Sequence, residues 1–240
     1  MKIAQIAPGV GETSTCVNCL RDAALLEEFR KLSHEVLVIP LYLPFRPQGL
    51  TPAAEVPIFF GGINVYLQQK LAFFRKTPRW LDSIFDNKKL LEWAGRKFQM
   101  VDTKLLGSTT VSMLKGSNGY QVKELDRLVS WLEKKENFPD VICLSNALLA
   151  GLAKALKEVL AVPVVCLLQG EDKFLDDLTE PYSQHAWQIL GDCAGEIDAF
   201  IALGEDYANA MKQRLGISAD KIHVVCDNKE IASVFTKILE

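Results

Sequence analysis

A short polar segment after an apolar run carries the side chains best suited to chemistry in this sequence. Gln169-Gly170-Glu171-Asp172 follows the apolar residues 163–168. Amide and carboxylate groups can hydrogen-bond to the hydroxyl groups of a sugar or polyol, and a glycine among them lets the backbone approach a ligand closely. We interpret this segment as the first candidate site. The alternative is a solvated turn in which Glu171 or Asp172 caps a helix.

A glycine-containing loop is the second candidate. Gly9 and Gly11 lie between an apolar run at 2–7 and a predicted helix. The free N–H groups and positive dipole end of a helix N-terminus favour phosphate, although Glu12 would repel a phosphate that it faced. The loop lacks the third glycine of the dinucleotide fingerprint and the Gly-Lys-Ser/Thr of a Walker A loop. A tight turn without a ligand is the alternative.

Ser145 and Asn146 follow the apolar residues 141–144 and form the third candidate. A hydroxyl and an amide at the start of a helix suit capping. They could also contact a substrate, because they follow the carboxyl end of a predicted strand, as the other two loops do.

Other familiar catalytic and metal-binding patterns are weak. Cys16 and Cys19 could form a redox pair at a helix start or half of a zinc site, but no second pair supplies the remaining ligands. The third interpretation is two thiols on the buried side of the helix. The histidines, which are His34, His185 and His223, form no catalytic triad with a Gly-x-Ser-x-Gly segment. We therefore expect no metal and no cofactor.

Alternating apolar and amphipathic segments must position these loops. The apolar segments read as strands at residues 2–7, 35–41, 141–144, 163–168, 199–203 and 221–225, with helices between them. The first strand, turn, helix and strand form a βαβ unit, which implies parallel pairing. The sequence predicts an α/β fold with a doubly wound parallel sheet. In such a sheet, ligands bind outside the carboxyl ends of the strands.

The middle of the chain is less regular. Residues 57–68 predict a hairpin across Gly61 and Gly62, with an amphipathic helix starting at Gly62 as the competing interpretation. Residues 71–100 read as two or three short helices, and residues 103–114 as another. We therefore expect a hairpin and a helical insertion between the two halves of the sheet.

The composition excludes several classes of protein. The 240 residues are 49% hydrophobic and 24% charged, which is ordinary globular usage and excludes a disordered chain, a collagen and a coiled coil. The formal charge of −3 gives no basic stripe for nucleic acid. No apolar stretch approaches the roughly 20 residues of a membrane helix, and the N-terminus lacks a signal-peptide apolar region. We expect a cytoplasmic protein with no nucleic-acid partner and no transmembrane segment.

Several segments, in order, resemble the N-terminal half of GT-B glycosyltransferases of the large retaining group 1 (family four) kind. Residues 2–9, a long helix and Leu32-Ser33-His34-Glu35-Val36 resemble the opening of that family. Pro139-Asp140-Val141 is similar to its Pro-Asp-Val strand, and residues 163–172 to its Pro-Val-Val…His-Gly-Glu-Asp segment. Residues 203–225 fit its last helix and strand, and residues 60–66 are similar to a hairpin of the glycogen-synthase-like branch.

The resemblance implies a two-domain enzyme without a bound metal. Its N-terminal half mostly holds the acceptor, and its C-terminal half mostly holds the nucleotide-sugar donor. We therefore expect residues 1–225 to be a Rossmann-like acceptor-side domain and residues 226–240 a C-terminal tail or truncated linker. The implied partners are a nucleotide-sugar donor, a sugar-containing acceptor and a missing C-terminal GT-B domain, without which the chain would be inactive.

The resemblance also assigns roles to the three candidate loops. Gln169, Glu171 and Asp172 would be catalytic, binding sugar hydroxyls near the reacting carbon. The substrate cleft would be lined by Gly9, Gly11, Glu12, Ser145, Asn146 and Gly170. Gln169 stands where the family has histidine, and glutamine can hydrogen-bond a hydroxyl but cannot transfer a proton. Catalysis would then depend on positioning and on stabilising the leaving-group charge.

A different class remains open, namely a Rossmann-like nucleotide-binding or interaction module without transfer activity. The dehydrogenase version of this class places an acidic residue at the end of the second strand. Here that strand ends Pro40-Leu41-Tyr42.

Overall fold

The computed structural model describes residues 1–8, 17–41, 56–57, 59–75 and 103–238. Its centre is a six-stranded parallel sheet with the strand order β2-β1-β3-β4-β5-β6. The strands are β1 (Lys2–Ala7), β2 (Glu35–Pro40), β3 (Val141–Leu144), β4 (Val164–Leu168), β5 (Ala199–Leu203) and β6 (Ile222–Val225). The predicted doubly wound α/β fold is confirmed.

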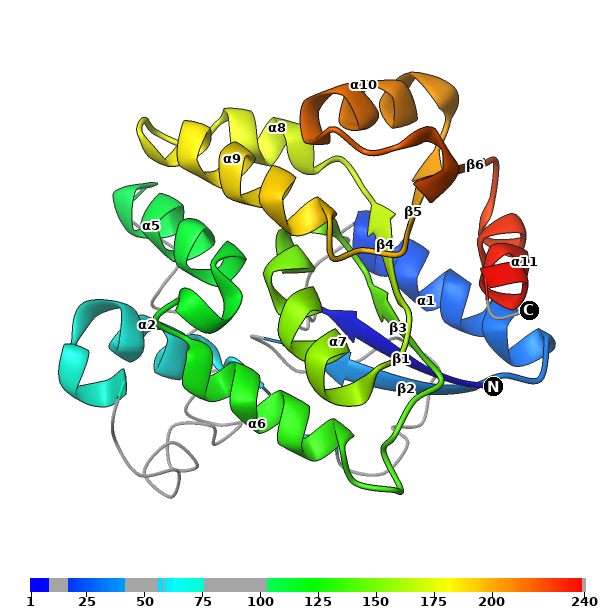
Figure 1. Cartoon of the computed structure of the whole chain (residues 1–240), viewed down its shortest axis with the longest axis horizontal. Coiled ribbons are helices and arrows are strands. Elements are labelled where there is room, and N and C mark those ends of the chain that lie inside the picture. Colours follow the sequence, from blue (N-terminus) through cyan, green and yellow to red (C-terminus); the bar gives the residue numbers. More distant parts are fainter. Residues whose placement is uncertain (9–16, 42–55, 58, 76–102, 239–240) are drawn as a thin grey trace.

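Helices cover both faces of this sheet (Figure 1). On one face lie α1 (Val17–Lys31) and α11 (Asn228–Ile238). The opposite face and its edges carry the remaining described helices: α2 (Gly62–Lys70), η1 (Ala72–Arg75), α5 (Thr103–Leu114), η2 (Gly116–Asn118), α6 (Val122–Leu132), η3 (Ala147–Leu152), α7 (Ala153–Leu160), α8 (Glu171–Asp176), α9 (Tyr182–Ala194), α10 (Glu205–Leu215) and η4 (Ala219–Lys221).

Strand alternation divides the core into two clusters. On β3, Ile142 and Leu144 belong to the larger cluster under η3, α5 and α9, while Val141 and Cys143 belong to the cluster under α1 and α11. Successive side chains of a strand point to opposite faces. Because every residue of β3 is buried, the strand is apolar throughout, as in other parallel sheets that are covered on both faces.

Helix α1 packs on the sheet through residues spaced three and four apart. Asp22, Leu25, Leu26 and Phe29 are all buried, and this i, i+3, i+4, i+7 spacing marks one face of a helix. Among the charged residues of α1, Asp22 alone is buried, because it occupies the first position of this stripe.

The predicted hairpin at residues 57–68 is also wrong, and the competing helix is correct. Residues 62–70 form α2. Phe59 makes one isolated parallel bridge to Leu41 instead of a hairpin ladder. The Gln68 amide donates to Glu124 Oε1 of α6 at 3.2 Å. Tertiary contacts of this kind override the β-propensity of a short alternating segment.

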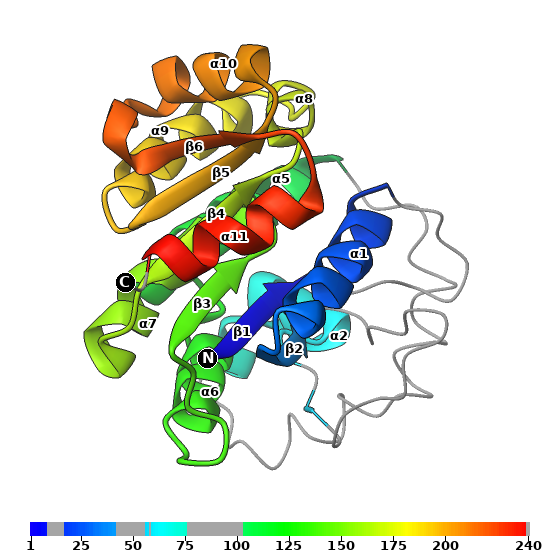
Figure 2. The same cartoon turned by 90° about the vertical axis from the view of Figure 1, so that its right-hand side faces the viewer.

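Residues after Val225, expected as a tail or linker, include helix α11. Its Ile231 and Phe235 are buried four residues apart, and the Phe235 ring meets the Phe29 ring of α1 edge-on, with centroids 5.0 Å apart. Figure 2 shows α11 crossing the sheet face beside α1. The first and last described helices therefore share one core cluster.

A close backbone contact fixes η3 against the end of α5. A Cβ atom added to Gly151 would overlap the carbonyl oxygens of Met113 and Leu114, the latter at 2.5 Å. Carbonyl oxygens of a packed helix cannot move aside as a flexible side chain can. Glycine is therefore required at this position.

We predict that Gly151→Ala lowers the free energy of unfolding by about 2 kcal/mol or more, as overpacking does in a rigid core. The matched control is Gly191→Ala in α9, where an added Cβ would meet nothing within 4 Å. There, better helix propensity should raise stability by up to about 1 kcal/mol. Urea titration followed by circular dichroism measures both. Equal stability of Gly151→Ala and the unchanged protein would contradict the prediction.

Candidate functional site

The order of the strands places three of the candidate loops side by side. From β1 the chain crosses to β2 on one side and continues from β3 to β6 on the other, so the direction of winding switches between β1 and β3. Ligands of open parallel sheets bind outside the carboxyl ends of the strands at such a switch. Pro8, Ser145 and Gln169 directly follow β1, β3 and β4.

Gln169 and Ser145 lie under α1. Alternation along β3 and β4 turns both toward the α1 face of the sheet, where they meet Asp22. The Gln169 amide nitrogen donates to Asp22 Oδ1 at 2.8 Å and to the Ser145 carbonyl at 2.6 Å. Two acceptors on one side fix the amide orientation. The buried Gln169 Oε1 then meets no donor among the described residues.

Asp22 is a buried acid with a shifted pKa. Its side chain is only 4% exposed, and burial raises its pKa to about 6, against smaller lowering effects of the Gln169 hydrogen bond and the Arg21 charge. Burial, and secondarily the negative charge of Asp22, raise the pKa of the Cys143 thiol beneath it. A titratable group with such a shift at a strand-end cluster is a functional-site candidate.

Glu171 joins three strand-end loops through a network with Tyr207. Its Oε1 accepts the Ala147 N–H after β3 at 2.7 Å, and its Oε2 accepts the Gln169 N–H after β4 at 2.8 Å. The Tyr207 hydroxyl of α10 donates to the same Oε2 at 2.7 Å. That hydroxyl in turn accepts the N–H groups of Gly170 and Glu171, at 2.9 and 3.1 Å. We call this set the Glu171 network.

The charge of Glu171 depends on this network. Burial raises the pKa of Glu171, while the hydrogen bonds from Tyr207 and the backbone oppose that rise. Burial and the nearby Glu171 charge also raise the pKa of Tyr207, which stays protonated as a donor.

These contacts turn the side chains of Gln169 and Glu171 toward other protein groups. Gln169 is 7% exposed and Glu171 4% exposed, and both oxygens of Glu171 already accept protein donors. The more accessible parts of this loop are Gly170, at φ +86°, and the half-buried Asp172. The catalytic assignments of Gln169, Glu171 and Asp172 stay predictions.

The remaining candidate residues cap a helix, are buried, or lie outside the described residues. Asn146 caps η3, because its Oδ1 accepts the Leu148 N–H at 3.1 Å. Ser145 is buried beside Gln169. The candidates Gly9, Gly11 and Glu12 lie outside the described residues, as do Cys16 and the Cys19 side chain.

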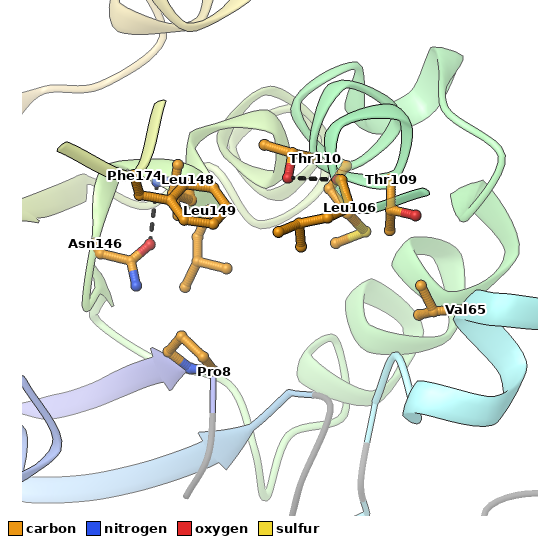
Figure 3. Close-up of a pocket in the computed structure, with 10 residues that line it drawn as sticks. Pro8, Val65, Leu106, Thr109, Thr110, Asn146, Leu148, Leu149 and Phe174 are labelled. Carbon is orange, nitrogen blue, oxygen red and sulfur yellow. Dashed lines mark hydrogen bonds between the residues drawn. The ribbon is translucent and has the colours of Figure 1, made fainter. Parts of the chain in front are cut away.

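A pocket of about 300 Å³ opens beside the switch point. We call it the switch-point pocket. Pro8 after β1 and Asn146 after β3 border one end, and Phe174 of α8 closes the side next to the Glu171 loop (Figure 3). Val65 of α2 and residues of α5 form the far wall. This pocket lies on the sheet face opposite to Asp22.

The described residues hold no cluster of three or more histidine, cysteine or acidic groups that could bind a metal ion. Nor does any helix in the described ranges have the length and hydropathy to cross a bilayer. The described residues of the site supply hydrogen-bonding groups, buried carboxyl groups and an apolar pocket.

Sequence reasoning missed Asp22 and the wall of the pocket. Asp22 could have been found, because an acid at the first position of the 22-25-26-29 stripe must lie under the helix. The far wall could not, since Val65 and Thr109 are far apart in the sequence and no motif links α2 to α5.

No protein-family model and no curated protein matches this chain. Three crystal structures of Arabidopsis thaliana UGT89C1 are similar to it. The complex with UDP-L-rhamnose is 14% identical, with a TM-score of 0.39, and the match covers 93% of this chain and 48% of that one. The complex with UDP is 11% identical, with a TM-score of 0.42, and the match covers 99% of this chain and 57% of that one. A third structure is 14% identical, with a TM-score of 0.39, covering 93% and 49%. The chain spans about half the length of these proteins.

We predict that Asp22→Asn removes part of the pH dependence of stability. The pKa of Asp22 is higher in the folded state, at about 6, than its ordinary value of 3.8. The protonated Asp22 side chain therefore stabilises the folded state fully below about pH 4. This contribution to the free energy of unfolding is lost as the pH rises through 6, a difference of about 3 kcal/mol. The Asp22→Asn variant should be more stable than the unchanged protein at pH 7.5, with a smaller decline between pH 4 and 7.

Urea titrations at several pH values measure this difference. The control is Asp177→Asn, an exposed acid, whose stability should follow the unchanged protein at each pH. Parallel pH profiles of Asp22→Asn and the unchanged protein would contradict the prediction.

We predict that Tyr207→Phe lowers the free energy of unfolding by about 1 to 3 kcal/mol, because it leaves buried partners of the Glu171 network unpaired. The Tyr207 hydrogen bond favours the charged form of Glu171, so the loss should be larger at pH 8 than at pH 5. Chemical denaturation at the two pH values measures it. Tyr120→Phe on the protein surface should show neither effect.

Proposed function

We propose that this chain is the acceptor-side domain of a GT-B glycosyltransferase that uses a nucleotide-sugar donor. Two kinds of support meet here. The ordered segments of the sequence resemble the N-terminal half of retaining group 1 enzymes. Independently, the strand order predicts a ligand at the switch between β1 and β3.

The observation that carries the proposal is the position of the switch-point pocket. Its border residues Pro8 and Asn146 follow the two strands of the switch, and Phe174 comes from the helix that begins at Glu171. The loop assigned to sugar binding from sequence therefore adjoins a pocket large enough for a small substrate. A bound acceptor would lie between the β1, β3 and β4 loops.

In the proposed reaction, the acceptor hydroxyl oxygen forms a bond to the anomeric carbon of the donor sugar. The bond between that carbon and the diphosphate oxygen breaks, and the leaving diphosphate takes the acceptor proton. No protein base is needed for this balance. The contribution of this chain is positioning, which is a large part of catalysis when two reactants must meet.

Each strand-end residue then has a proposed role. Asp172, which is half-buried and beside exposed Gly170, accepts hydrogen bonds from donor-sugar hydroxyls. Glu171 and Gln169 hold that loop in place through the contacts described above. Gly9, Gly11 and Glu12 remain proposed contacts to the donor, and a second α/β domain supplies most of the donor site.

The alternative, a nucleotide-binding module without transfer activity, differs in what it should bind. The described end of β2 carries Pro40 and the buried Leu41 in place of the ribose-binding carboxylate of dehydrogenases. NAD should therefore bind no better than an unrelated nucleotide.

We predict that millimolar UDP-glucose, ADP-glucose or GDP-mannose shifts the backbone amide signals of Asn146, Gly170 and Asp172 in the full chain, measured by NMR. Asp172→Ala should weaken this binding at least threefold, because a charged hydrogen bond to the sugar is lost. Asp177→Ala, an exposed acid six residues from Glu171, is the matched control and should bind as the unchanged chain does.

Three outcomes would count against the proposed function. The first is tighter binding of NAD than of the nucleotide sugars. The second is a set of amide-signal shifts at the amino ends of the strands, around Asp140 and Asp198. The third is efficient sugar transfer by residues 1–240 alone, which would remove the need for a second domain.

A further inference from the structure

The switch-point pocket has a lining that suits one class of molecule. Its walls are mostly apolar, with Leu148 and Leu149 of η3 facing Leu106 and Met113 of α5. Phe174 closes the end next to α8 (Figure 3). An apolar body transferred from water into such a lining is stabilised roughly in proportion to its buried area.

Few polar groups of the lining are free to bind a ligand. The Thr110 hydroxyl donates to the Leu106 carbonyl at 2.9 Å, and Asn146 Oδ1 is occupied by the Leu148 N–H. Within the described residues, the groups left over are the Asn146 amide nitrogen and the Thr109 hydroxyl. Figure 3 shows the Asn146 nitrogen on the side nearest Pro8.

This count disfavours a sugar ring inside the pocket. Each sugar hydroxyl brings one donor and two acceptor positions, and burying a hydroxyl without a partner is unfavourable. In the described part of the lining, these few groups leave most hydroxyls of a hexose without a hydrogen-bond partner. One oxygen at the end of an apolar body needs only one of them.

We propose that the switch-point pocket binds a compact apolar molecule with a single oxygen at one end, an alcohol or phenol, oriented with that oxygen at Asn146. This inference rests on the proposed function and narrows its acceptor, which the sequence resemblance would make sugar-containing. The orientation puts the oxygen at the β1–β3 end of the pocket. That end is where the reacting sugar would have to arrive.

The test uses three probes on the full chain, with binding followed by NMR of the methyl groups of Leu106, Met113 and Leu148. The probes are 2-methoxynaphthalene, naphthalene and methyl α-glucoside. The ether keeps an acceptor oxygen but carries no proton, so its preference over naphthalene reports the Asn146 donor. We expect the ether to bind about tenfold more tightly than naphthalene, which corresponds to one hydrogen bond of about 1.4 kcal/mol, and the glucoside not to shift these methyl groups.

Two variants and a control localise the binding. Asn146→Asp keeps the oxygen that caps η3 and replaces the free amide nitrogen, so the ether should fall to the affinity of naphthalene. Thr109→Phe fills the pocket and should weaken both aromatic probes at least tenfold. Thr179→Phe makes the same change at an exposed threonine outside the pocket and should leave binding unchanged.

Each opposite result overturns the inference. Ether binding that Thr109→Phe leaves intact would place the probe elsewhere, and equal affinity for ether and naphthalene would remove the role of Asn146. Glucoside binding that Thr109→Phe abolishes would make the acceptor a carbohydrate and leave the proposed function standing. If instead nucleotide sugars fail to bind at Asp172 while the ether binds here, the proposed function fails and the pocket assignment survives.

Discussion

One buried carboxylate, that of Glu171, connects the segments that follow the carboxyl ends of β3, β4 and β5. Glu171 accepts backbone N–H groups from the loops after β3 and β4 and the hydroxyl of Tyr207 from the helix after β5. Parallel strands are joined by long crossovers, so their end loops are independent of one another unless side chains connect them. A buried charge is tolerated only when hydrogen bonds satisfy it. The same requirement that stabilises Glu171 therefore also fixes the relative positions of the segments after β3 and β4 and of helix α10.

The two faces of the sheet offer different environments at the carboxyl ends of the strands. Toward α1, the end of β4 carries Gln169, which donates to Asp22 of that helix, and both side chains are buried and polar. Toward α5 and η3, they border an apolar pocket. The alternation of side chains along β3 and β4 makes this division, because Ser145 and Gln169 must point away from the face to which Leu144 and Leu168 point. A substrate in the pocket would meet the ends of the strands and not the buried acid.

The architecture could be predicted from the sequence because it follows from the local alternation of apolar strands and amphipathic helices. Fully apolar strands such as Val164–Leu168 and amphipathic helices between them leave little choice but a parallel sheet. The hairpin failed at Gln68, whose buried amide donates to Glu124 of α6, a helix far away in the sequence. The positions of Ser145 and Gln169 after their strands could be predicted from the sequence, whereas their contacts could not. Glu171 was correctly placed at a strand end, but only the distant Ala147 and Tyr207 decide that its oxygens face inward. Asp22 was missed although its spacing marks it as buried.

The contact between Phe29 and Phe235 has a consequence for biosynthesis. A chain leaves the ribosome from its N-terminus, and its early elements fold while later ones are still being made. Helix α1 emerges long before α11, which covers the same cluster. Until α11 emerges, the apolar side of Phe29 has no partner from that helix, and the nascent domain exposes a hydrophobic surface of the kind that chaperones recognise. Closure of this sheet face must therefore wait for the synthesis of α11.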